Sequence, residues 1–299
     1  MIPGWLRESW PWLLAAFDIA AATTVTVHAV LHNRDSRAVI GWVGLAWLAP
    51  FVGSLAYLLL GINRIRRKAA ALHLRDVRAA AAAIHPAPSH LERAEELRSR
   101  YGHLEGLVEL GRNLTGLSLA PGNTVEPLID GDETYPAMIA AIDDARHSVT
   151  LLSYIFDNDR AGDAFVAALR RAQERGVEVR VLVDHLGSRY SKPSIISRLR
   201  EVGLPVRAFL PTRAPRLSRY ANLRNHRKIL VADGRIGFTG GTNIREGHWR
   251  SLDPATPVQC MHFRLTGPVV AHLQEAFTID WAFASGEVLT GATWFPDVE

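Results

Sequence analysis

The stretch Asn225-His226-Arg227-Lys228-Ile229-Leu230-Val231-Ala232-Asp233-Gly234-Arg235-Ile236-Gly237-Phe238-Thr239-Gly240-Gly241-Thr242-Asn243 decides the fold of this chain. Its apolar run Ile229–Ala232 predicts a buried strand. The dipeptide Asp233-Gly234 favours a tight hairpin turn, so Ile236–Thr239 is expected to return antiparallel to the first strand. The sequence therefore predicts a β-hairpin around which the rest of the chain is organised.

The polar residues at the open end of this hairpin suit a phosphate group. His226 and Lys228 are two positions apart, so on an extended strand both side chains point to one face. An imidazole can attack phosphorus, while the Lys228 ammonium and the Asn243 amide can hold the non-bridging oxygens. Gly240 and Gly241 allow backbone donors to approach closely. A metal site is not expected, because lysine is a poor ligand and no carboxylate cluster lies nearby in the sequence.

Each of these features also has a purely structural explanation. A histidine beside a lysine at a strand start is usually a solvated pair, and an Asp-Gly dipeptide is usually only a turn. The functional interpretation depends on the complete spacing, which is His-x-Lys, four residues, Asp, six residues, Gly-Gly, and then x-Asn. This spaced set resembles the signature of the phospholipase D superfamily.

The resemblance implies a role for each residue of the signature. It implies that His226 is the nucleophile, that Lys228 and Asn243 contact the phosphate oxygens, and that Gly240 and Gly241 shape the pocket. Asp233, the third member of the catalytic motif, is expected to organise the hairpin rather than to touch substrate. Outside the hairpin, Tyr154 lies near a predicted strand end, where it either lines the pocket or is an ordinary buried aromatic residue.

Composition bounds the class of protein. With 299 residues, of which 48% are hydrophobic, the chain is long enough for one sizeable domain and an appendage. A formal charge of +4 and a pI near 9.5 favour an anionic partner, either a lipid headgroup or a nucleic acid. Cys260 is the only cysteine, which excludes an internal disulfide and is compatible with a reducing compartment.

Two apolar runs predict an N-terminal transmembrane hairpin in residues 1–68. The run Val39–Asn63 contains no charged residue, and the run Trp12–Leu31 is long enough to span a bilayer. The run Trp12–Leu31 contains Asp18 and His28, which are costly in lipid unless they are paired or face another helix. A buried helical hairpin of a soluble protein is the alternative, and a cleaved signal peptide fits poorly because the second run follows at once.

Basic residues predict the orientation of this hairpin. Arg64, Arg66, Arg67 and Lys68 directly follow the second run, and the positive-inside rule places them in the cytoplasm. Arg34 and Arg37, in the connecting loop, argue for the opposite orientation. The larger cluster favours a multi-pass protein of the inner membrane with a cytoplasmic catalytic domain, and it would attract anionic lipid surfaces.

The remaining chain divides into a linker and an α/β domain. Residues 69–121 are expected to be a helical linker, with helices over Ala69–Ile84 and Ser89–Arg112. Residues 122–299 alternate between strands and helices, which predicts a mostly parallel sheet with helices on both faces, the layered fold that the superfamily resemblance also implies. Strands are expected over Thr124–Ile129, Ser148–Tyr154, Val177–Val183, Pro205–Leu210 and Phe263–Pro268, and helices over Glu133–Arg146, Ala164–Arg175, Ser194–Glu201 and Val269–Trp281.

Further short matches narrow the resemblance to bacterial cardiolipin synthases. They are Trp47-Leu48-Ala49-Pro50-Phe51-Val52-Gly53, Ser153-Tyr154-Ile155-Phe156, Arg175-Gly176-Val177 leading to Asp184 and Gly187-Ser188, and Thr266-Gly267-Pro268 ending at Asp280-Trp281. The resemblance implies transfer of a phosphatidyl group through a phosphohistidine. The donor would be phosphatidylglycerol or a related phospholipid, the acceptor an alcohol, and no metal or other cofactor would be required.

The chain departs from that family in having one His-x-Lys motif where two are expected. The mechanism needs a second histidine to protonate the leaving alkoxide and later deprotonate the acceptor. The chain therefore resembles an N-terminal half. Three alternatives follow: a second copy completes the site in a homodimer, a separate C-terminal half completes it, or the chain is inactive. His185, His248 and His262 are weak internal substitutes, and Cys260 stands where the family pattern more often has an acidic residue.

Two other functions compete with the phosphatidyltransferase. A phosphodiesterase acting on nucleic acid would use the same histidine chemistry, but a nuclease gains little from confinement beside a bilayer, so no nucleic-acid partner is expected. A regulatory membrane protein that binds anionic lipid is the alternative from a different class, and the missing second motif is its main support.

Overall fold

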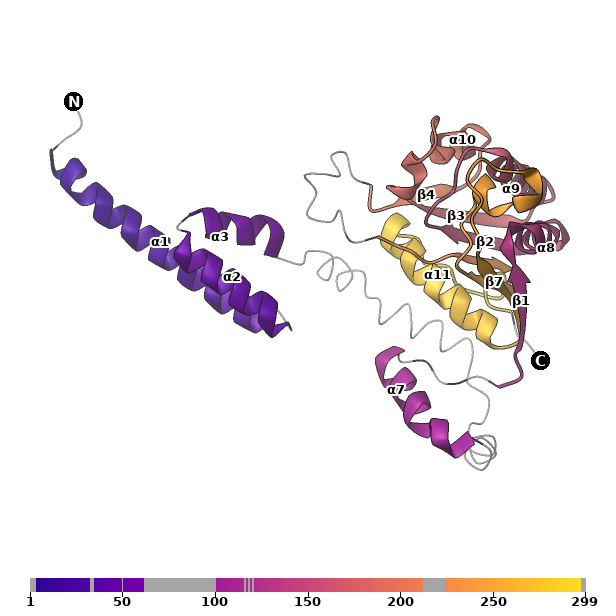
Figure 1. The fold of residues 1–299 in the computed structure, drawn as a ribbon, viewed down its shortest axis with the longest axis horizontal. Helices are drawn as coiled ribbons and strands as arrows, with labels where there is room; N and C mark the ends of the chain where they lie inside the picture. The colour runs from indigo at the N-terminus through magenta and orange to yellow at the C-terminus, as the bar shows by residue number, and fades with distance from the viewer. Residues whose placement is uncertain are drawn as a thin grey trace. The chain divides into compact units, whose positions relative to one another are not determined.

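In the computed structural model, the described residues are 4–32, 35–49, 51–61, 101–115, 117, 119, 121–211 and 224–296. The chain forms two compact units, Met1–Lys68 and Ala69–Glu299. Figure 1 shows the helices and strands of both.

A seven-stranded mixed sheet forms the centre of the second unit, in the order β1-β7-β6-β5-β2-β3-β4. The strands are β1 (Thr124–Ile129), β2 (Ser148–Ser153), β3 (Glu178–Asp184), β4 (Val206–Phe209), β5 (Ile229–Ala232), β6 (Ile236–Gly240) and β7 (Met261–Thr266). Only β2 with β3 and β3 with β4 pair in parallel, so the expectation of a mostly parallel sheet is wrong. The cause is the β5–β6 hairpin, since a tight turn can join only antiparallel strands, and β7 then pairs antiparallel with β6.

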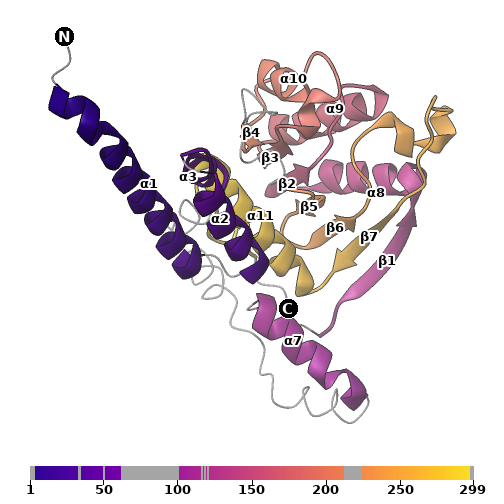
Figure 2. The same ribbon diagram turned by 60° about the vertical axis from the view of Figure 1, so that its left-hand side comes forward.

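Helices cover both faces of this sheet, as predicted (Figure 2). One face is covered by α8 (Asp130–Asp144), α9 (Arg160–Glu174) and α10 (Ile195–Glu201). Their buried side chains, including Tyr135 and Phe165, pack into one core cluster with Leu230. The other face is covered by α11 (Val269–Ser285), whose Phe277 packs with Val231 in a second cluster. Neighbouring residues of β5 thus face opposite cores.

The starts of two helices differ from expectation for local reasons. Helix α8 begins at Asp130 rather than Glu133, because Asp130 turns the chain with φ 53° and its carboxylate accepts the N–H of Cys260 at 2.7 Å. Helix α9 begins at Arg160 rather than Ala164. Its N-cap is Asp159, whose carboxylate accepts the N–H of Gly162 at 3.0 Å.

The first unit contains α1 (Gly4–His32), α2 (Ser36–Leu48), α3 (Val52–Ala56) and a π-helical turn, η1 (Tyr57–Gly61). Of the described helices, only Ser9–His32 is long and apolar enough to cross a membrane. The continuous helix expected over Val39–Asn63 is wrong, because α2 ends at Leu48 and α3 starts at Val52. The sequence has a proline at position 50, which has no N–H to continue a helix.

The described part of the linker contains η2 (Gly102–Leu104) and α7 (Glu105–Thr115). Helix α7 overlaps the last part of the helix expected over Ser89–Arg112. The helix expected over Ala69–Ile84 lies outside the described residues.

Candidate active site at one end of the central strands

The β5–β6 hairpin forms with the predicted strands and turn. Ile229 pairs with Thr239 and Ala232 with Ile236. Asp233 and Gly234 have φ values of 52° and 62°, the left-handed conformation that a tight hairpin turn requires. His226 and Lys228 therefore precede β5 at the open end of the hairpin, where β6 also ends at Gly240.

The sheet brings Tyr154 to the same end. Strand β2 runs antiparallel to β5 and pairs Leu152 with Ile229, so the residue that follows β2 meets the residues that precede β5. The rings of Tyr154 and His226 are stacked, with centroids 4.0 Å apart and an interplanar angle of 30°. Tyr154 is half-buried and supports one face of the His226 imidazole, which is exposed.

Lys228 places a positive charge beside these two rings. Its Nζ donates to the backbone oxygen of His226 at 2.7 Å and lies 5.5 Å from the centroid of the Tyr154 ring. Burial lowers the pKa of Lys228 from its ordinary value, with Cys260 opposing that effect. A half-buried ammonium has lost part of its hydration. The electrostatic attraction between it and an anionic ligand would therefore be stronger here than in open solvent.

The glycine pair and Asn243 close the same end of the hairpin. A Cβ at Gly240 would lie 2.7 Å from Cα of His262, and one at Gly241 would lie 2.6 Å from Sγ of Cys260. No larger residue fits either position without a shift of its neighbours. The Asn243 side-chain oxygen accepts the N–H of Ile155 at 3.1 Å, so the amide nitrogen is the end that can donate to a ligand.

Asp233 lies at the opposite end of β5 from His226. Its carboxylate accepts the backbone N–H groups of Arg146, His147 and Ser148 at 2.9, 2.7 and 2.9 Å. These bonds join the turn to the chain between α8 and β2. Asp233 therefore holds the turn and lies apart from the end of the hairpin that carries His226 and Lys228.

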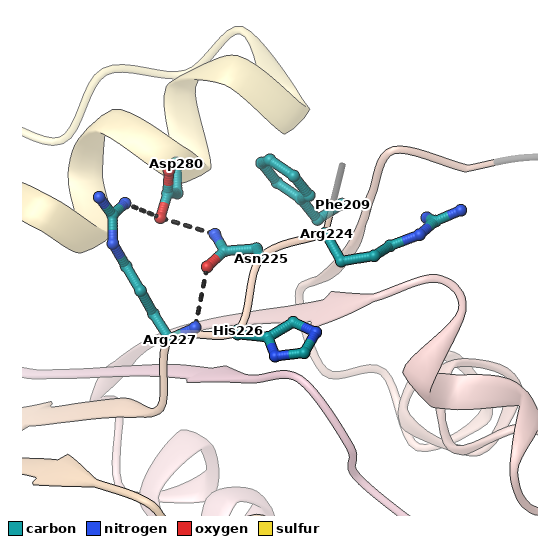
Figure 3. A pocket seen from close by; sticks show the side chains of 6 residues that line it. All are labelled: Phe209, Arg224, Asn225, His226, Arg227 and Asp280. Atoms are coloured by element: carbon teal, nitrogen blue, oxygen red, sulfur yellow. Dashed lines mark hydrogen bonds and ion pairs between the residues drawn. The ribbon is translucent and has the colours of Figure 1, made fainter. Parts of the chain in front are cut away.

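A bracing network that holds the segment before β5 was missed by sequence reasoning. Asp184, at the end of β3, accepts the N–H of Asn225 at 3.1 Å. Asp280, on α11, accepts from the Asn225 amide at 2.7 Å and from Arg227 at 2.5 Å. Figure 3 shows Asn225 and Arg227 both directed at Asp280. The sequence did contain a signal, because Asp184 and Asp280 both stand in the short matches to bacterial cardiolipin synthases. Their spacing along the chain does not indicate that both bind Asn225.

A pocket of about 530 Å³ opens beside His226 and is lined by Phe209, Arg224, Asn225, His226, Arg227 and Asp280 (Figure 3). Two arginines give it a basic lining. Arg224 pairs with Asp184 at 3.7 Å and Arg227 with Asp280 at 2.5 Å, so each aspartate orients one cation. Phe209, at the end of β4, was not anticipated from the sequence.

The weak internal substitutes for a second histidine are poorly suited to proton donation. His262 is 1% exposed, and burial, with the nearby Lys228 and His248, lowers its pKa to about 4. Burial also lowers the pKa of His248 and of His185. A neutral imidazole at neutral pH lacks the proton that a leaving alkoxide needs.

Metal chemistry has no obvious ligand set in the part of the chain that the structure describes. No group of three or more His, Cys, Asp or Glu side chains there is arranged to hold an ion. Cys260 is a half-buried free thiol beside the Gly241 turn.

Comparisons with known proteins agree with this geometry. Residues 138–281 match the family described as "Cardiolipin synthase, PLD-like domain". Cardiolipin synthase A of Pseudomonas fluorescens (strain SBW25) is 34% identical over 290 residues, which is 93% of this chain and 58% of that protein. Cardiolipin synthase 1 of Bacillus anthracis is 30% identical over 284 residues, 89% of this chain and 52% of that protein. The chain thus spans little more than half the length of these relatives.

Among solved structures, Nuc from Salmonella typhimurium, a phospholipase D family member, is 19% identical with a TM-score of 0.42, covering 57% of this chain and all of that one. The hairpin and the spaced motif both lie within residues 138–281, so this part of the chain is a phospholipase D-like domain. The chain as a whole resembles bacterial cardiolipin synthases over a little more than half of their length.

Proposed function

We propose that this chain carries the nucleophile of a membrane-bound phosphatidyltransferase of the cardiolipin synthase or phospholipase D type. The observation that carries the proposal is the exposed His226 imidazole, held against Tyr154 beside the Lys228 ammonium and a basic pocket. The names of its relatives support a phospholipid substrate.

In the first step, a ring nitrogen of His226 attacks the phosphorus of a phosphatidylglycerol-type donor. The new P–N bond forms as the P–O bond to the headgroup alcohol breaks, and that alkoxide takes a proton from a general acid. In the second step, a hydroxyl of the acceptor attacks phosphorus, gives its proton to the same group and breaks the P–N bond. Lys228 and the Asn243 amide would stabilise charge on the non-bridging oxygens in both steps.

The general acid requires a partner, because the sequence has a single His-x-Lys motif. We propose that a second motif comes either from another copy of this chain in a homodimer or from a separate C-terminal half. The donor would be drawn from the anionic lipid of the inner membrane, with the catalytic unit on the cytoplasmic side. Neither a metal nor a cofactor enters these steps, so added EDTA is expected to leave turnover unchanged.

The test is turnover of radiolabelled phosphatidylglycerol by purified full-length protein in lipid vesicles. His226→Gln is expected to abolish turnover, and His147→Gln, which alters an exposed histidine away from the pocket, is expected to leave it intact. Acid quench of the wild type should trap labelled phosphate on His226. Label on another side chain, or turnover that survives in His226→Gln, would refute the proposal.

Two further results would select the competing functions. Lipid binding without turnover in either protein, even with a C-terminal half supplied, would select the regulatory membrane protein. Cleavage of DNA without lipid turnover would select the nucleic-acid phosphodiesterase.

A further inference from the structure

The second apolar run of the first unit folds back on itself, because α2 and α3 lie side by side. A Cβ added to Gly53 of α3 would lie 2.1 Å from the backbone oxygen of Leu45 in α2, so the two helices touch backbone to backbone. Further from the turn, the rings of Trp42 and Tyr57 lie 5.5 Å apart. The two segments therefore run antiparallel, as the arms of a short helical hairpin.

The same hairpin is fixed against α1 at two levels. The Asp18 carboxylate accepts the N–H of Phe51 at 2.9 Å, and the rings of Phe17 and Phe51 are stacked at 5.9 Å. Further along both segments, beyond Asp18 in α1 and beyond Phe51 in the second run, the Tyr57 hydroxyl lies 2.8 Å from Nδ1 of His28. From the first contact to the second, α1 and the α3 arm advance in the same direction. Gly61, one turn beyond Tyr57, therefore lies at the end of α1 that holds His32.

The lengths of the helices separate one spanning element from two that cannot span. Ser9–His32 has 24 residues with a mean hydropathy of 1.6. Helix α2 has 13 residues and Val52–Gly61 has ten, which correspond to about 20 Å and about 15 Å. The hydrocarbon core is about 30 Å thick, and apolar helices this short are typical of re-entrant or interfacial segments.

The surface and the break of the short hairpin both fit hydrocarbon surroundings. Large apolar side chains are exposed on both arms, among them Ile40 at 72%, Leu48 at 87% and Val52 at 68%. Irregular backbone at membrane depth must have its polar groups paired within the protein. At the break, Asp18 satisfies the N–H of Phe51, and Ala49 accepts the N–H of Gly53 at 2.8 Å. The bond also gives Asp18, a costly residue in lipid, a partner at the positive end of a helix.

We propose that α1 crosses the membrane once and that α2 and α3 form a re-entrant helical hairpin, which enters and leaves on the side of His32. The charge pattern supports this arrangement. In a two-span topology, the two arginines of the connecting loop and the basic cluster after the second run lie on opposite sides of the membrane. One of the two basic groups then violates the positive-inside rule. The residues are Arg34 and Arg37 in the loop and Arg64, Arg66, Arg67 and Lys68 in the cluster. In the re-entrant topology all of these residues share one side, and that side is cytoplasmic. The Gly4 end of α1 then lies on the opposite side.

Single-cysteine labelling tests this topology without using enzyme activity, so its failure is distinguishable from failure of the proposed function. Cys260 is the only native cysteine, and a Cys260→Ser background accepts one new cysteine at a time. The two new cysteines are Gly4→Cys, at the start of α1, and Ser36→Cys, shortly after its end. A membrane-impermeant maleimide is applied to spheroplasts and to inside-out vesicles.

We expect Gly4→Cys to react at least tenfold more in spheroplasts, and Ser36→Cys at least tenfold more in inside-out vesicles. The two-span hairpin gives the reverse for both positions and would overturn the proposal. Reaction of both from the same side would overturn it as well, because α1 would then not cross. Native Cys260, in the unaltered chain, reports the side of the catalytic unit in the same preparations.

The Asp18 bond supplies a second measurement. Asp18→Ala removes the partner of the Phe51 N–H and is expected to increase labelling of a Phe51→Cys side chain by a lipid-soluble maleimide at least threefold, because the turn loosens. Thr24→Ala, which removes an exposed hydroxyl of α1 bonded only to its own helix, is the matched control. Equal labelling in the Asp18→Ala and Thr24→Ala backgrounds would show that Asp18 does not hold the turn.

Discussion

Among single residues, the charge of Lys228 bears most directly on the proposed chemistry. Lys228→Met removes the ammonium but keeps a side chain of similar length, so kcat for lipid turnover is expected to fall by roughly 10² to 10³. Lys228→Arg keeps the charge in a larger planar group and should retain more activity than Lys228→Met. Comparison of kcat for the three proteins in vesicles is the measurement, and an unchanged kcat in Lys228→Met would exclude contact with the transition state.

His262 predicts a pH dependence of stability. Its pKa is lowered from 6.5 to about 4 in the folded chain, so between these pH values the unfolded state binds more protons than the folded state. The contribution of His262 to the free energy of unfolding is therefore fully present above pH 6.5. It is lost as the pH falls toward 4, and the loss is roughly 3 kcal/mol at most. Urea unfolding of the detergent-solubilised chain at several pH values measures it.

The matched comparison for this effect is His262→Asn, which does not titrate in the range. The difference in unfolding free energy between wild type and His262→Asn should shift in favour of wild type as the pH rises from 4 to 6.5. A difference that stays constant across this range would show that the folded imidazole titrates normally.

At the scale of single elements, the β5–β6 turn is anchored by one carboxylate. Asp233→Ala removes three charge-assisted hydrogen bonds, from the backbone N–H groups of Arg146, His147 and Ser148. Arg146 and His147 are exposed, so water can replace part of what is lost. We expect a loss of about 3 kcal/mol in unfolding free energy. The control is Glu174→Ala, which breaks an exposed pair with Arg170 and should cost less than about 0.5 kcal/mol. Equal losses in the two variants would contradict the anchoring role.

Helix α11 positions the nucleophile through Asp280. Asp280→Ala releases both Asn225 and Arg227, the neighbours of His226, and is expected to lower kcat about tenfold with little change in KM. Asp280→Asn keeps one acceptor oxygen and should lose less. Trapping of labelled phosphate on His226 after acid quench would report the position of the imidazole directly, and an unaltered rate of trapping in Asp280→Ala would rule out a positioning role.

At the scale of the whole molecule, a single motif predicts that activity depends on a second chain. If two copies form one site, hetero-oligomers of wild type and His226→Ala, isolated with two different tags, should have well under half of the wild-type activity, because each mixed site has one histidine. Half of the activity would mean that each copy acts alone or with another protein. Addition of a C-terminal half with its own His-x-Lys motif would then distinguish these two cases.

The sequence was a reliable guide where local chemistry decides structure. The apolar run Ile229–Ala232, the Asp233-Gly234 turn and the His226 and Lys228 spacing located the hairpin and its open end. It was unreliable where distant parts meet. The direction of β5, β6 and β7 in the sheet, the contact of Tyr154 with His226, and the bracing of Asn225 by Asp280 depend on pairings between residues far apart in the chain.

The sequence by itself predicted the class of chemistry, because His226, Lys228 and Asn243, at the spacing of the phospholipase D signature, are groups that can attack and hold a phosphate. It also determined that the first unit is apolar. Only the tertiary structure decided that the sheet is mixed and that the second apolar run turns back at Phe51. The reason is that the contacts that hold the reversed segment join residues far apart in the chain, among them the bond from the Phe51 N–H to the Asp18 carboxylate, 33 residues away.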